Sequence, residues 1–385
     1  MKCRVCRGPA IIDIRRHNAN FCSEHFLKLC RDQTAKAIAQ FDMLQPGDRV
    51  LVAVSGGKDS LAVWDILNEL GYDAEGFYVG LGIGEYSDVS AEYATRFAHA
   101  RNLTLHTEDL LRDHGFDVPH GSRAAKRAPC SACGLTKRHL FDEAARRGGY
   151  DAIVTGHNLD DEAAVLMGNV LHWHTDYLAR QTPMLPARDG FPKKAKPLVR
   201  LTERETAAYC VLRGIDYLVD ECPMAVGNKH LAYKEQLNEL ERTSPGAKFD
   251  FYFRFLLDAQ DRFAEAEAER TDISLQACGR CGAPTNNDIC SFCALTERAT
   301  RPVPLTIGRK PQESPHEPQR CVAGRRARAV DRPQEAALPD RPRGRRRVPF
   351  ALRRAPARRV DRKTGRGDVP VEPGHGVHRH SPDDH

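Results

Sequence analysis

The sequence lacks any apolar run that approaches the length of about 20 residues needed to cross a bilayer as a helix. It also lacks an apolar h-region near the N-terminus, where charged residues and cysteines stand instead. We therefore expect a cytosolic protein that neither spans a membrane nor is secreted.

A strong excess of charge of one sign is also missing. The 58 basic and 52 acidic residues leave a formal net charge of +6, while charged residues make up 29% of the chain. This balance does not identify a nucleic-acid-binding protein, although local basic patches are compatible with a polyanionic partner. With 385 residues, of which 41% are apolar, the chain can bury a substantial core.

Cysteine, in contrast, is plentiful. The sequence has 13 cysteines, and most of them fall in short CxxC pairs. In a reducing compartment such pairs favour metal or redox chemistry over disulfides.

Short β-branched runs alternate with helical patterns through the middle of the chain, which predicts an α/β fold with a doubly wound parallel sheet. The predicted strands are Arg49–Val54, Ala74–Val79, Leu103–Glu108, Asp151–Thr155 and Ile215–Val219. The predicted helices are Phe26–Phe41, Ser60–Leu70, Val89–Arg101, Cys133–Arg147, Asp160–Leu171 and Glu203–Arg213, followed by a helical stretch from His230 to about Glu269.

Two cysteine clusters flank this region, and each offers four N/S ligands in two close pairs. Such spacing is typical of a tetrahedral structural zinc site, which organises a small lobe and leaves no ligand position open for catalysis. We predict an N-terminal zinc finger over residues 1–30 and a C-terminal zinc ribbon over residues 271–300. The candidate ligands are Cys3, Cys6, Cys22 and His25 at the first site, and Cys278, Cys281, Cys290 and Cys293 at the second.

The last segment, residues 301–385, is rich in Arg and Pro and has almost no aliphatic periodicity. It cannot build a core, and we interpret it either as a disordered basic tail or as an out-of-frame translation. Cys30, Cys210 and Cys321 have no partner at metal spacing, and we assign them to the core or the tail.

Ser55-Gly56-Gly57-Lys58-Asp59-Ser60 follows the first predicted strand and opens a helix. Free backbone N–H groups and the positive end of the helix converge there, and the glycines allow close approach of a phosphate. No Walker A pattern is present. The hexapeptide resembles the SGGxDS signature of the PP-loop ATP pyrophosphatases; the alternative is a glycine-rich turn without a ligand.

A second motif, Thr155-Gly156-His157-Asn158-Leu159-Asp160-Asp161-Glu162-Ala163, ends a later strand and again opens a helix. It looks like the GHNLDDEA segment of the tRNA-thiolating PP-loop enzymes. Asp160 or Asp161 is a candidate magnesium ligand, and Asp59 in the first motif is another. The alternative reading is an acidic helix start that complements the macrodipole.

Cys130, Cys133 and Cys222 form a third group of thiols, predicted to converge at one end of the sheet. Three cysteines can hold a [4Fe–4S] cluster whose fourth iron stays open for an external sulfide. The competing readings are a persulfide on Cys130 or Cys222, a further zinc site, and buried free thiols. Lys137, one helical turn after Cys133, can reach phosphates or an adenylated oxygen, or is merely solvated.

Together, the zinc finger, SGGKDS, CxxC, GHNLDDEA, the lone downstream cysteine and the zinc ribbon resemble the TtuA family of tRNA 2-thiouridine synthetases over residues 1 to about 300. The resemblance implies a PP-loop catalytic domain over residues 31–270 that adenylates the 2-carbonyl oxygen of a tRNA uridine or ribothymidine and replaces it with sulfur. It implies Mg-ATP, two zinc ions, a [4Fe–4S] cluster on Cys130, Cys133 and Cys222, and a ubiquitin-like thiocarboxylate sulfur carrier. A homodimer is also expected. The catalytic candidates are Asp59, Lys137, Asp161, Cys130 and Cys222, and the ATP-binding candidates are Ala53, Ser55, Gly56, Gly57, Lys58, Ser60, Val79, Lys137 and Gly156.

The resemblance favours position 54 of the T-loop as the target; thiolation of the wobble uridine or of an anticodon-loop cytidine is the alternative. The cytidine branch typically lacks the two zinc lobes. Amidotransfer requires a source of ammonia, and nothing in the sequence resembles a glutaminase. A zinc-dependent RNA-binding or sulfur-delivery scaffold without catalysis is the alternative from another class.

Overall fold

The chain was analysed as a computed structural model, which describes residues 1–225, 229–268 and 275–301. The predicted tail at 301–385 lies outside these residues apart from Arg301, as do Cys321 and the end of the helical stretch at Glu269. None of the helices in the described ranges is both long and apolar enough to cross a membrane.

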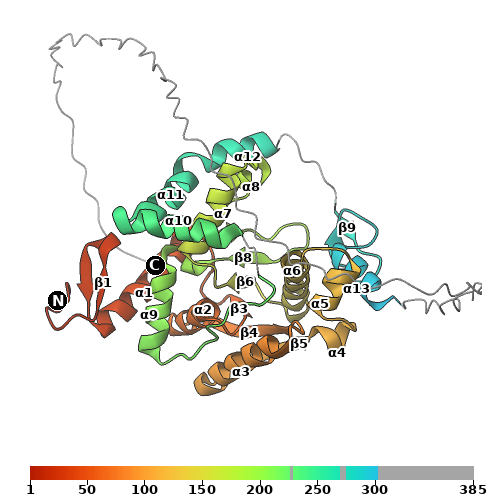
Figure 1. The fold of residues 1–385 in the computed structure, drawn as a ribbon, viewed down its shortest axis with the longest axis horizontal. Coiled ribbons are helices and arrows are strands. Elements are labelled where there is room, and N and C mark those ends of the chain that lie inside the picture. Colours follow the sequence, from red (N-terminus) through yellow and green to blue (C-terminus); the bar gives the residue numbers. More distant parts are fainter. Residues whose placement is uncertain (226–228, 269–274, 302–385) are drawn as a thin grey trace, which may run out of the picture. The chain divides into compact units, whose positions relative to one another are not determined.

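A six-stranded sheet forms the centre of the fold, in the order β5-β4-β3-β6-β8-β7 (Figure 1). All neighbouring strands are parallel except β7, which pairs antiparallel with β8 at the edge. The strands are β3 Arg49–Val54, β4 Asp73–Gly80, β5 Leu105–Asp109, β6 Ala152–Thr155, β7 Met184–Leu185 and β8 Lys193–Ala195. The doubly wound α/β fold is therefore confirmed.

Helices cover both faces of the sheet, because the central strands are apolar on both sides. In β3, Val50, Val52 and Val54 belong to one core with Trp64 of α2, and Leu51 belongs to the opposite core with Leu140 of α6. The long helices are α1 Ser23–Gln40, α2 Lys58–Glu69, α3 Gly84–Arg101, α6 Pro129–Gly148, α7 Leu159–Leu171, α9 Glu203–Arg213, α10 Lys229–Thr243 and α11 Ala247–Asp258. The shorter ones are α4 Leu110–His114, α5 Val118–Ala124, α8 Thr175–Ala179, α12 Gln260–Ala268 and the 3-10 helix η2 Pro197–Arg200.

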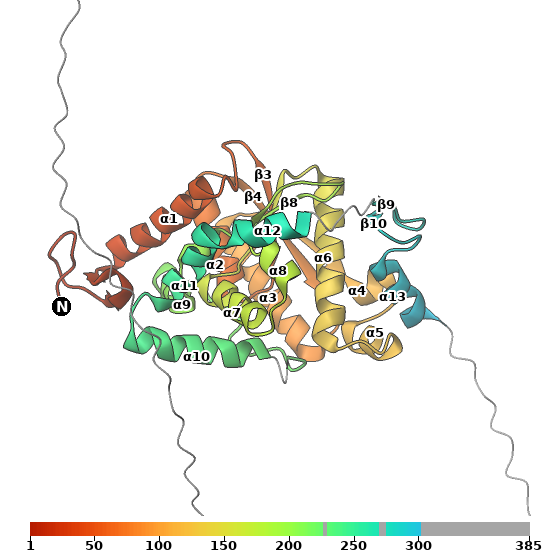
Figure 2. The ribbon, with the colours of Figure 1, turned by 90° about the horizontal axis from the view of Figure 1, so that it is seen from above.

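Two small lobes carry the terminal cysteine clusters. The N-terminal one is a hairpin of β1 Ile12–Ile14 and β2 Ala19–Phe21 joined by the 3-10 helix η1 Arg15–His17. The C-terminal one pairs β9 Gln276–Ala277 with β10 Pro284–Thr285 and ends in α13 Ser291–Thr300, which packs on α5 and α6 (Figure 2).

The prediction of a last strand at Ile215–Val219 is wrong. Only Leu218 makes a bridge, to Gly57, and its N–H donates to the carbonyl oxygen of Gly56 at 2.9 Å. The place beside β6 is taken by β8, so this segment crosses the loop before α2 instead of extending the sheet. The helical stretch after His230 is divided into three helices, with Gly246 in a left-handed conformation between the first two.

Candidate active site

The loop between β3 and α2 is held by hydrogen bonds among its own residues, and it packs closely against α3. The Ser60 hydroxyl accepts a hydrogen bond from the Ser55 N–H at 3.1 Å and donates to the Gly57 carbonyl at 2.9 Å. Gly56 has a φ of +73°, and a Cβ atom there would lie 2.4 Å from the backbone oxygen of Ser90. Only glycine fits this position, and the loop therefore presents its backbone at the N-terminus of α2, where an anion is favoured.

Lys58, the first residue of α2, lies between two carboxylates. Its Nζ is 2.8 Å from Oε1 of Glu203 and 3.1 Å from Oδ2 of Asp59. Burial alone would lower the pKa of Lys58, but the two carboxylates raise it well above its usual value. The ammonium is thus charged at all physiological pH values and lies where a phosphate oxygen can replace a carboxylate as its partner.

The Thr155–Ala163 motif meets the phosphate loop from the neighbouring strand. Asn158 caps α7 by accepting from the N–H groups of Asp160 and Asp161, and its amide donates to Asp59 at 3.1 Å. A Cβ on Gly156 would lie 2.6 Å from the backbone of Asp59 and Ser60. The glycine is thus required by close packing of the two motifs, in addition to any nucleotide that approaches it.

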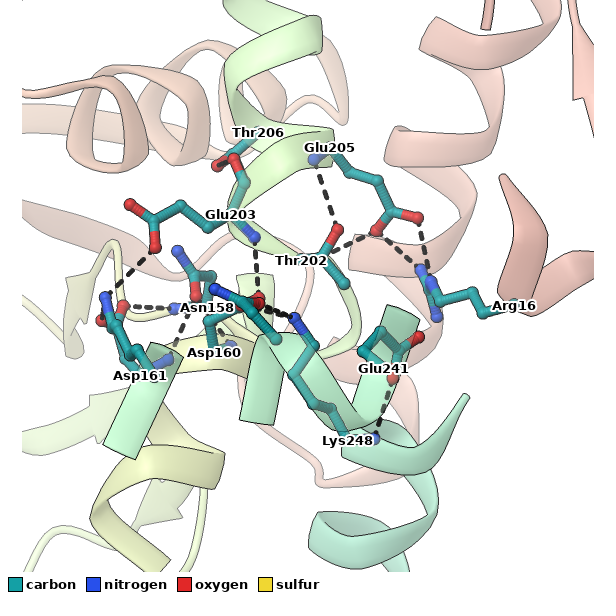
Figure 3. A network of polar contacts seen from close by, with 12 residues as sticks. Arg16, Asn158, Asp160, Asp161, Thr202, Glu203, Glu205, Thr206, Glu241 and Lys248 are labelled. Atoms are coloured by element: carbon teal, nitrogen blue, oxygen red, sulfur yellow. Dashed lines mark hydrogen bonds and ion pairs between the residues drawn. The ribbon is translucent and has the colours of Figure 1, made fainter. Parts of the chain in front are cut away.

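The two adjacent aspartates of this motif have different surroundings. Asp160 is buried, and it accepts from the Lys248 ammonium and from the Glu203 N–H at 2.9 Å, so its charge holds α7, α9 and α11 together. Asp161 is half-buried and its Oδ1 lies 2.6 Å from Nζ of Lys234. Of the two magnesium candidates, Asp161 therefore lines the site and Asp160 is a structural anchor (Figure 3).

Asp59, Asp161 and Glu203 form a carboxylate cluster bridged by lysines. Lys234 Nζ lies 3.3 Å from Oε2 of Glu203 as well as beside Asp161. Burial raises the pKa of Asp59. Burial acts on Asp161 in the same sense, but the Lys234 ammonium overcomes it and holds the pKa of Asp161 below its usual value. Three carboxylates of unequal basicity beside a phosphate loop are suited to a hydrated magnesium ion and a triphosphate.

Three residues of this cluster did not appear among the sequence candidates. Glu203 begins α9, Thr206 one turn later donates to Asp59, and Lys234 lies on α10. They carry no local motif, since an isolated Glu, Thr or Lys on a helix is usually solvated. The threonine cap of α9 at Thr202 was the one local signal, because a capping position places the first helical residues at a helix end.

The N-terminal lobe docks on the other side of the same helix start. Arg16 of η1 donates to both carboxylate oxygens of Glu205, at 2.9 and 2.7 Å, and to the carbonyl of Arg200 at 2.9 Å. Both side chains of the ion pair are buried. Glu205 also accepts from the Thr202 N–H at 2.8 Å in a capping box (Figure 3). The first turn of α9 thus contacts the N-terminal lobe through Glu205 and Lys58 of the Ser55–Ser60 motif through Glu203.

The three central thiols lie on α6 and on the segment after Leu218. Cys130 and Cys133 lie in the first turns of α6, and the Cys130 thiol contacts the carbonyl of Met224 at 3.6 Å. Burial raises the pKa of Cys133; the Lys137 ammonium opposes this, and Cys222 and Cys130 reinforce it. Cys133 and Cys222 pack against the same core. Within the described residues, however, the three sulfur atoms are not among the groups whose ligand atoms all lie within 4.8 Å of one another, so their convergence on one cluster remains a prediction. Tyr86 of α3, which the sequence did not single out, packs against the same core as Cys133 and Cys222, and burial together with these two thiols raises the pKa of Tyr86.

The other ATP candidates lie around this point. Ala53 and Val79 are buried near the ends of the adjacent strands β3 and β4, so only their backbone groups are available to a base. Lys137 is half-buried and makes no hydrogen bond or ion pair within the described part of the chain. Its positive charge lowers the pKa of Cys133 against the larger effect of burial.

Each terminal cluster brings four ligand atoms within 4.8 Å of one another: Cys3, Cys6, Cys22 and His25 in one lobe, and Cys278, Cys281, Cys290 and Cys293 in the other. Burial would raise the pKa of Cys3, but N–H groups of Cys6, Cys22 and Val5 lower the pKa to about 6. N–H groups of Cys290, Cys281 and Arg280 likewise lower the pKa of Cys278 to about 6 against burial. A thiolate is the form that binds zinc, and both quartets fit a tetrahedral ion.

Comparisons with known proteins agree with this architecture. The family model of the N-terminal LIM domain of the 2-thiouridine synthetase TtuA matches residues 2–27, and the PP-loop domain model matches residues 30–227. A tRNA-5-methyluridine(54) 2-sulfurtransferase of Thermus thermophilus is 46% identical over 301 residues, which cover 78% of this chain and 92% of that protein.

Two further similarities are more distant. Cytoplasmic tRNA 2-thiolation protein 1 of Bos taurus is 30% identical over 336 residues, covering 83% of this chain and 95% of that protein. The structure of the U34-tRNA thiolase NcsA from Methanococcus maripaludis with its [4Fe-4S] cluster matches in fold, with a TM-score of 0.64 at 24% identity over 77% of this chain and 96% of that one. By the two family models and the close relative, the chain belongs to the TtuA family of PP-loop tRNA 2-thiouridine synthetases.

Proposed function

We propose that this protein is an ATP-dependent tRNA 2-thiolase that adenylates the 2-carbonyl oxygen of a uridine or ribothymidine at T-loop position 54 and replaces it with sulfur. The observation that supports the proposal is the meeting of two sites. The phosphate loop with its lysines and carboxylates lies at the ends of β3 and β6, and Leu218 bridges Gly57 of this loop four residues before Cys222. Cys222 packs against the same core as Cys133, whose pKa the Lys137 ammonium lowers against burial.

In the first step the 2-carbonyl oxygen forms a bond to the α-phosphorus of ATP, and the bond between the α- and β-phosphates breaks. Lys58 and the backbone of Gly56 and Gly57 stabilise the charge on the departing pyrophosphate. Asp59 and Asp161 would hold magnesium, which offsets that charge when bound. Lys234 sets the charge of Asp161. Lys58 and Asp59 belong to α2, Asp161 to α7 and Lys234 to α10, so these groups are already in place and little reorganisation is needed.

In the second step a sulfur atom forms a bond to C2 of the base, and the C2–O bond breaks as AMP leaves with the former carbonyl oxygen. Lys137 is placed to stabilise the negative charge on that oxygen. Cys130, Cys133 and Cys222 would hold a [4Fe–4S] cluster, which supplies an iron coordination position for sulfide when bound. The same thiols are also suited to a persulfide mechanism, which the iron content separates from the first.

The remaining assignments extend from the family. We propose that both cysteine quartets bind zinc, that the sulfur comes from a ubiquitin-like carrier with a C-terminal thiocarboxylate, and that the enzyme is a cytoplasmic homodimer. Wobble uridine is the second candidate target, because relatives of both kinds share the fold: one is named for position 54, and NcsA is named a U34-tRNA thiolase.

The test combines anaerobically purified protein with ATP, sulfide and tRNA that carries ribothymidine at position 54 but no sulfur. We expect AMP release that depends on tRNA, and 2-thiolated ribothymidine at position 54 after nuclease digestion and mass spectrometry. In Cys222→Ala about four irons are lost, while about two zinc ions per chain remain. If the wild-type protein contains no iron after reconstitution, the persulfide mechanism is supported. Thiolation at the wobble position would make that uridine the target. If no tRNA stimulates AMP release, the proposed catalytic activity is rejected in favour of a binding scaffold.

A further inference from the structure

Large side chains are exposed where α7 ends and around α8, beside the start of α10. Leu171, Trp173 and Tyr177 are 56%, 71% and 56% exposed. Single exposed apolar residues are common on soluble proteins, but a contiguous group of them marks an interaction surface.

Five rings in this region follow one another as neighbours, and Trp173 stands between two of them in the sequence. His230 packs edge-on to Tyr233 at 6.0 Å, and the Tyr233 hydroxyl lies 3.2 Å from the His172 ring nitrogen. His172 stacks with His174 at 5.4 Å, and His174 lies 5.7 Å from Tyr177. We name this surface the ring array: His172, Trp173, His174, Tyr177, His230 and Tyr233.

The backbone conformation around Trp173 keeps the side chains of the ring array at the surface. Trp173 has a φ of +52°, a left-handed conformation that is uncommon for a bulky side chain. It is fixed by its own N–H to the carbonyl of Val170 and by the N–H of His174 to the carbonyl of Asn169 at 2.9 Å. A Cβ on Gly168 would lie 2.9 Å from the Tyr233 ring, so this glycine lets Tyr233 lie flat against α7.

Cationic and hydrogen-bonding groups stand among the rings. The Arg180 guanidinium lies 5.5 Å from the centre of the Tyr177 ring, and it pairs with Asp176 at 3.5 Å, which offsets the charge of that carboxylate. Three of the six rings are imidazoles, which donate hydrogen bonds and become cationic on protonation. Exposed ring faces interleaved with Arg and His are how proteins bind unpaired nucleotides, by base stacking, cation–π contact and phosphate contact.

The array and the phosphate site share two helices. Asp161 lies at the N-terminal end of α7 and His172 follows its C-terminal end, so the two are roughly 15–18 Å apart along the helix. On α10, Tyr233 of the array is adjacent to Lys234 of the carboxylate cluster. One bound RNA can therefore contact both regions.

We propose that the ring array is a stacking surface for unpaired nucleotides of the tRNA substrate, with Trp173 and Tyr177 against bases and Arg180 beside the backbone phosphates. This inference rests on the proposed function, because it takes tRNA as the substrate. It assigns to RNA a surface away from the phosphate loop and the thiols.

The two tryptophans of the chain make a direct test possible. Trp64 is fully buried and Trp173 is exposed, so tRNA that stacks on the array quenches the fluorescence of Trp173 alone. We expect saturable quenching on titration with an unmodified tRNA transcript, and its loss in Trp173→Phe, in which tRNA still binds. Trp173→Ala weakens tRNA binding about tenfold.

Two controls separate stacking from other effects. Leu111→Ala removes another exposed apolar side chain, on α4, and leaves tRNA affinity unchanged. Trp173 carries no charge, so the slope of log affinity against log salt is the same in Trp173→Ala and wild type. A change in that slope, or wild-type tRNA affinity in both Trp173→Ala and Tyr177→Ala, overturns the proposal.

The homodimer alternative is tested in the same samples. If Trp173→Ala converts a dimer to a monomer in sedimentation while tRNA affinity per site is unchanged, the array is an interface between copies and the proposal is wrong. If tRNA quenches Trp173 fluorescence in the wild-type protein but is never thiolated, the ring array still binds RNA and only the proposed function is rejected.

Discussion

A buried, bidentate ion pair between Arg16 and Glu205 joins the N-terminal lobe to the candidate active site. Nη2 of the arginine lies 2.7 Å from Oε2 of the glutamate. Glu205 belongs to the first turn of α9, whose Glu203 and Thr206 contact Lys58 and Asp59. The lobe is therefore a structural support for the carboxylate cluster.

Replacing Arg16 with Met leaves the Glu205 carboxylate buried without its partner. An uncompensated buried charge costs about 3–5 kcal/mol, so we expect that loss in the free energy of unfolding measured with urea. Glu205→Gln in the same chain removes the charge and keeps the capping box, and the double variant recovers most of the loss. A double variant as unstable as Arg16→Met would mean that packing, not the unpaired charge, sets the effect.

Gly156 is expected to tolerate no side chain. In Gly156→Ala the new methyl group meets the backbone of Asp59 and Ser60, which cannot rotate away, and overpacking of this kind costs about 1–3 kcal/mol. Because Asp59 and Ser60 belong to the first turn of α2, the methyl group displaces this helix. We expect a lower free energy of unfolding in urea and a weaker affinity for ATP. Gly57→Ala is the matched control, because its Cβ meets only the Ser55 hydroxyl at 3.6 Å and should cost less than about 1 kcal/mol.

The framework of this fold was predictable because its signals are local. β3 coincides with the predicted Arg49–Val54, since a strand buried on both faces is a continuous apolar run. β7 and β8 were missed because they have two and three residues, and the lysines of β8 are held by tertiary partners: Lys193 by Asp48 and Lys194 by Asp142. Nothing in the local sequence marks such a strand.

The residues of the candidate site likewise fall into those that a local motif predicts and those that only tertiary contacts bring in. Ser55–Ser60 and Thr155–Ala163 are recognisable because a phosphate loop or a helix start needs particular residues in series. The ion pairs of Glu203 with Lys58 and of Lys234 with Asp161 join separate helices, and the choice between Asp160 and Asp161 depends on which one Lys248 reaches. These relations are set by tertiary packing and cannot be read from spacing.

The C-terminal lobe is expected to depend on its metal. Cys293→Ser should reduce the zinc content by about one ion per chain and release Phe292, whose ring stacks on His139 of α6 at 4.2 Å. Metal analysis measures the loss of zinc, and faster limited proteolysis within residues 275–301 measures the release of Phe292. Cys30→Ala removes a buried thiol outside either quartet and should retain both zinc ions; zinc unchanged in Cys293→Ser would reject the second site.

The carboxylate cluster should impose a pH dependence that Lys234 controls. In the folded protein the pKa of Asp161 is below its usual 3.8, so its contribution to stability is complete above that value and is lost as the pH falls through the lower folded pKa. Lys234→Met removes the cation, and burial then raises the pKa of Asp161 above 3.8, so that the ionised form destabilises the fold.

The stability difference between wild type and Lys234→Met should therefore be small near pH 3 and increase to about 1–3 kcal/mol at pH 7, measured by urea unfolding across that range. Lys229→Met is the matched control, since this exposed lysine on the same helix has no ion-pair partner in the ranges that the structure covers. A difference that stays constant with pH would show that Lys234 stabilises by packing alone. In that case ATP affinity should respond equally at every pH, whereas a charge role predicts that the loss of affinity follows the ionisation of Asp161.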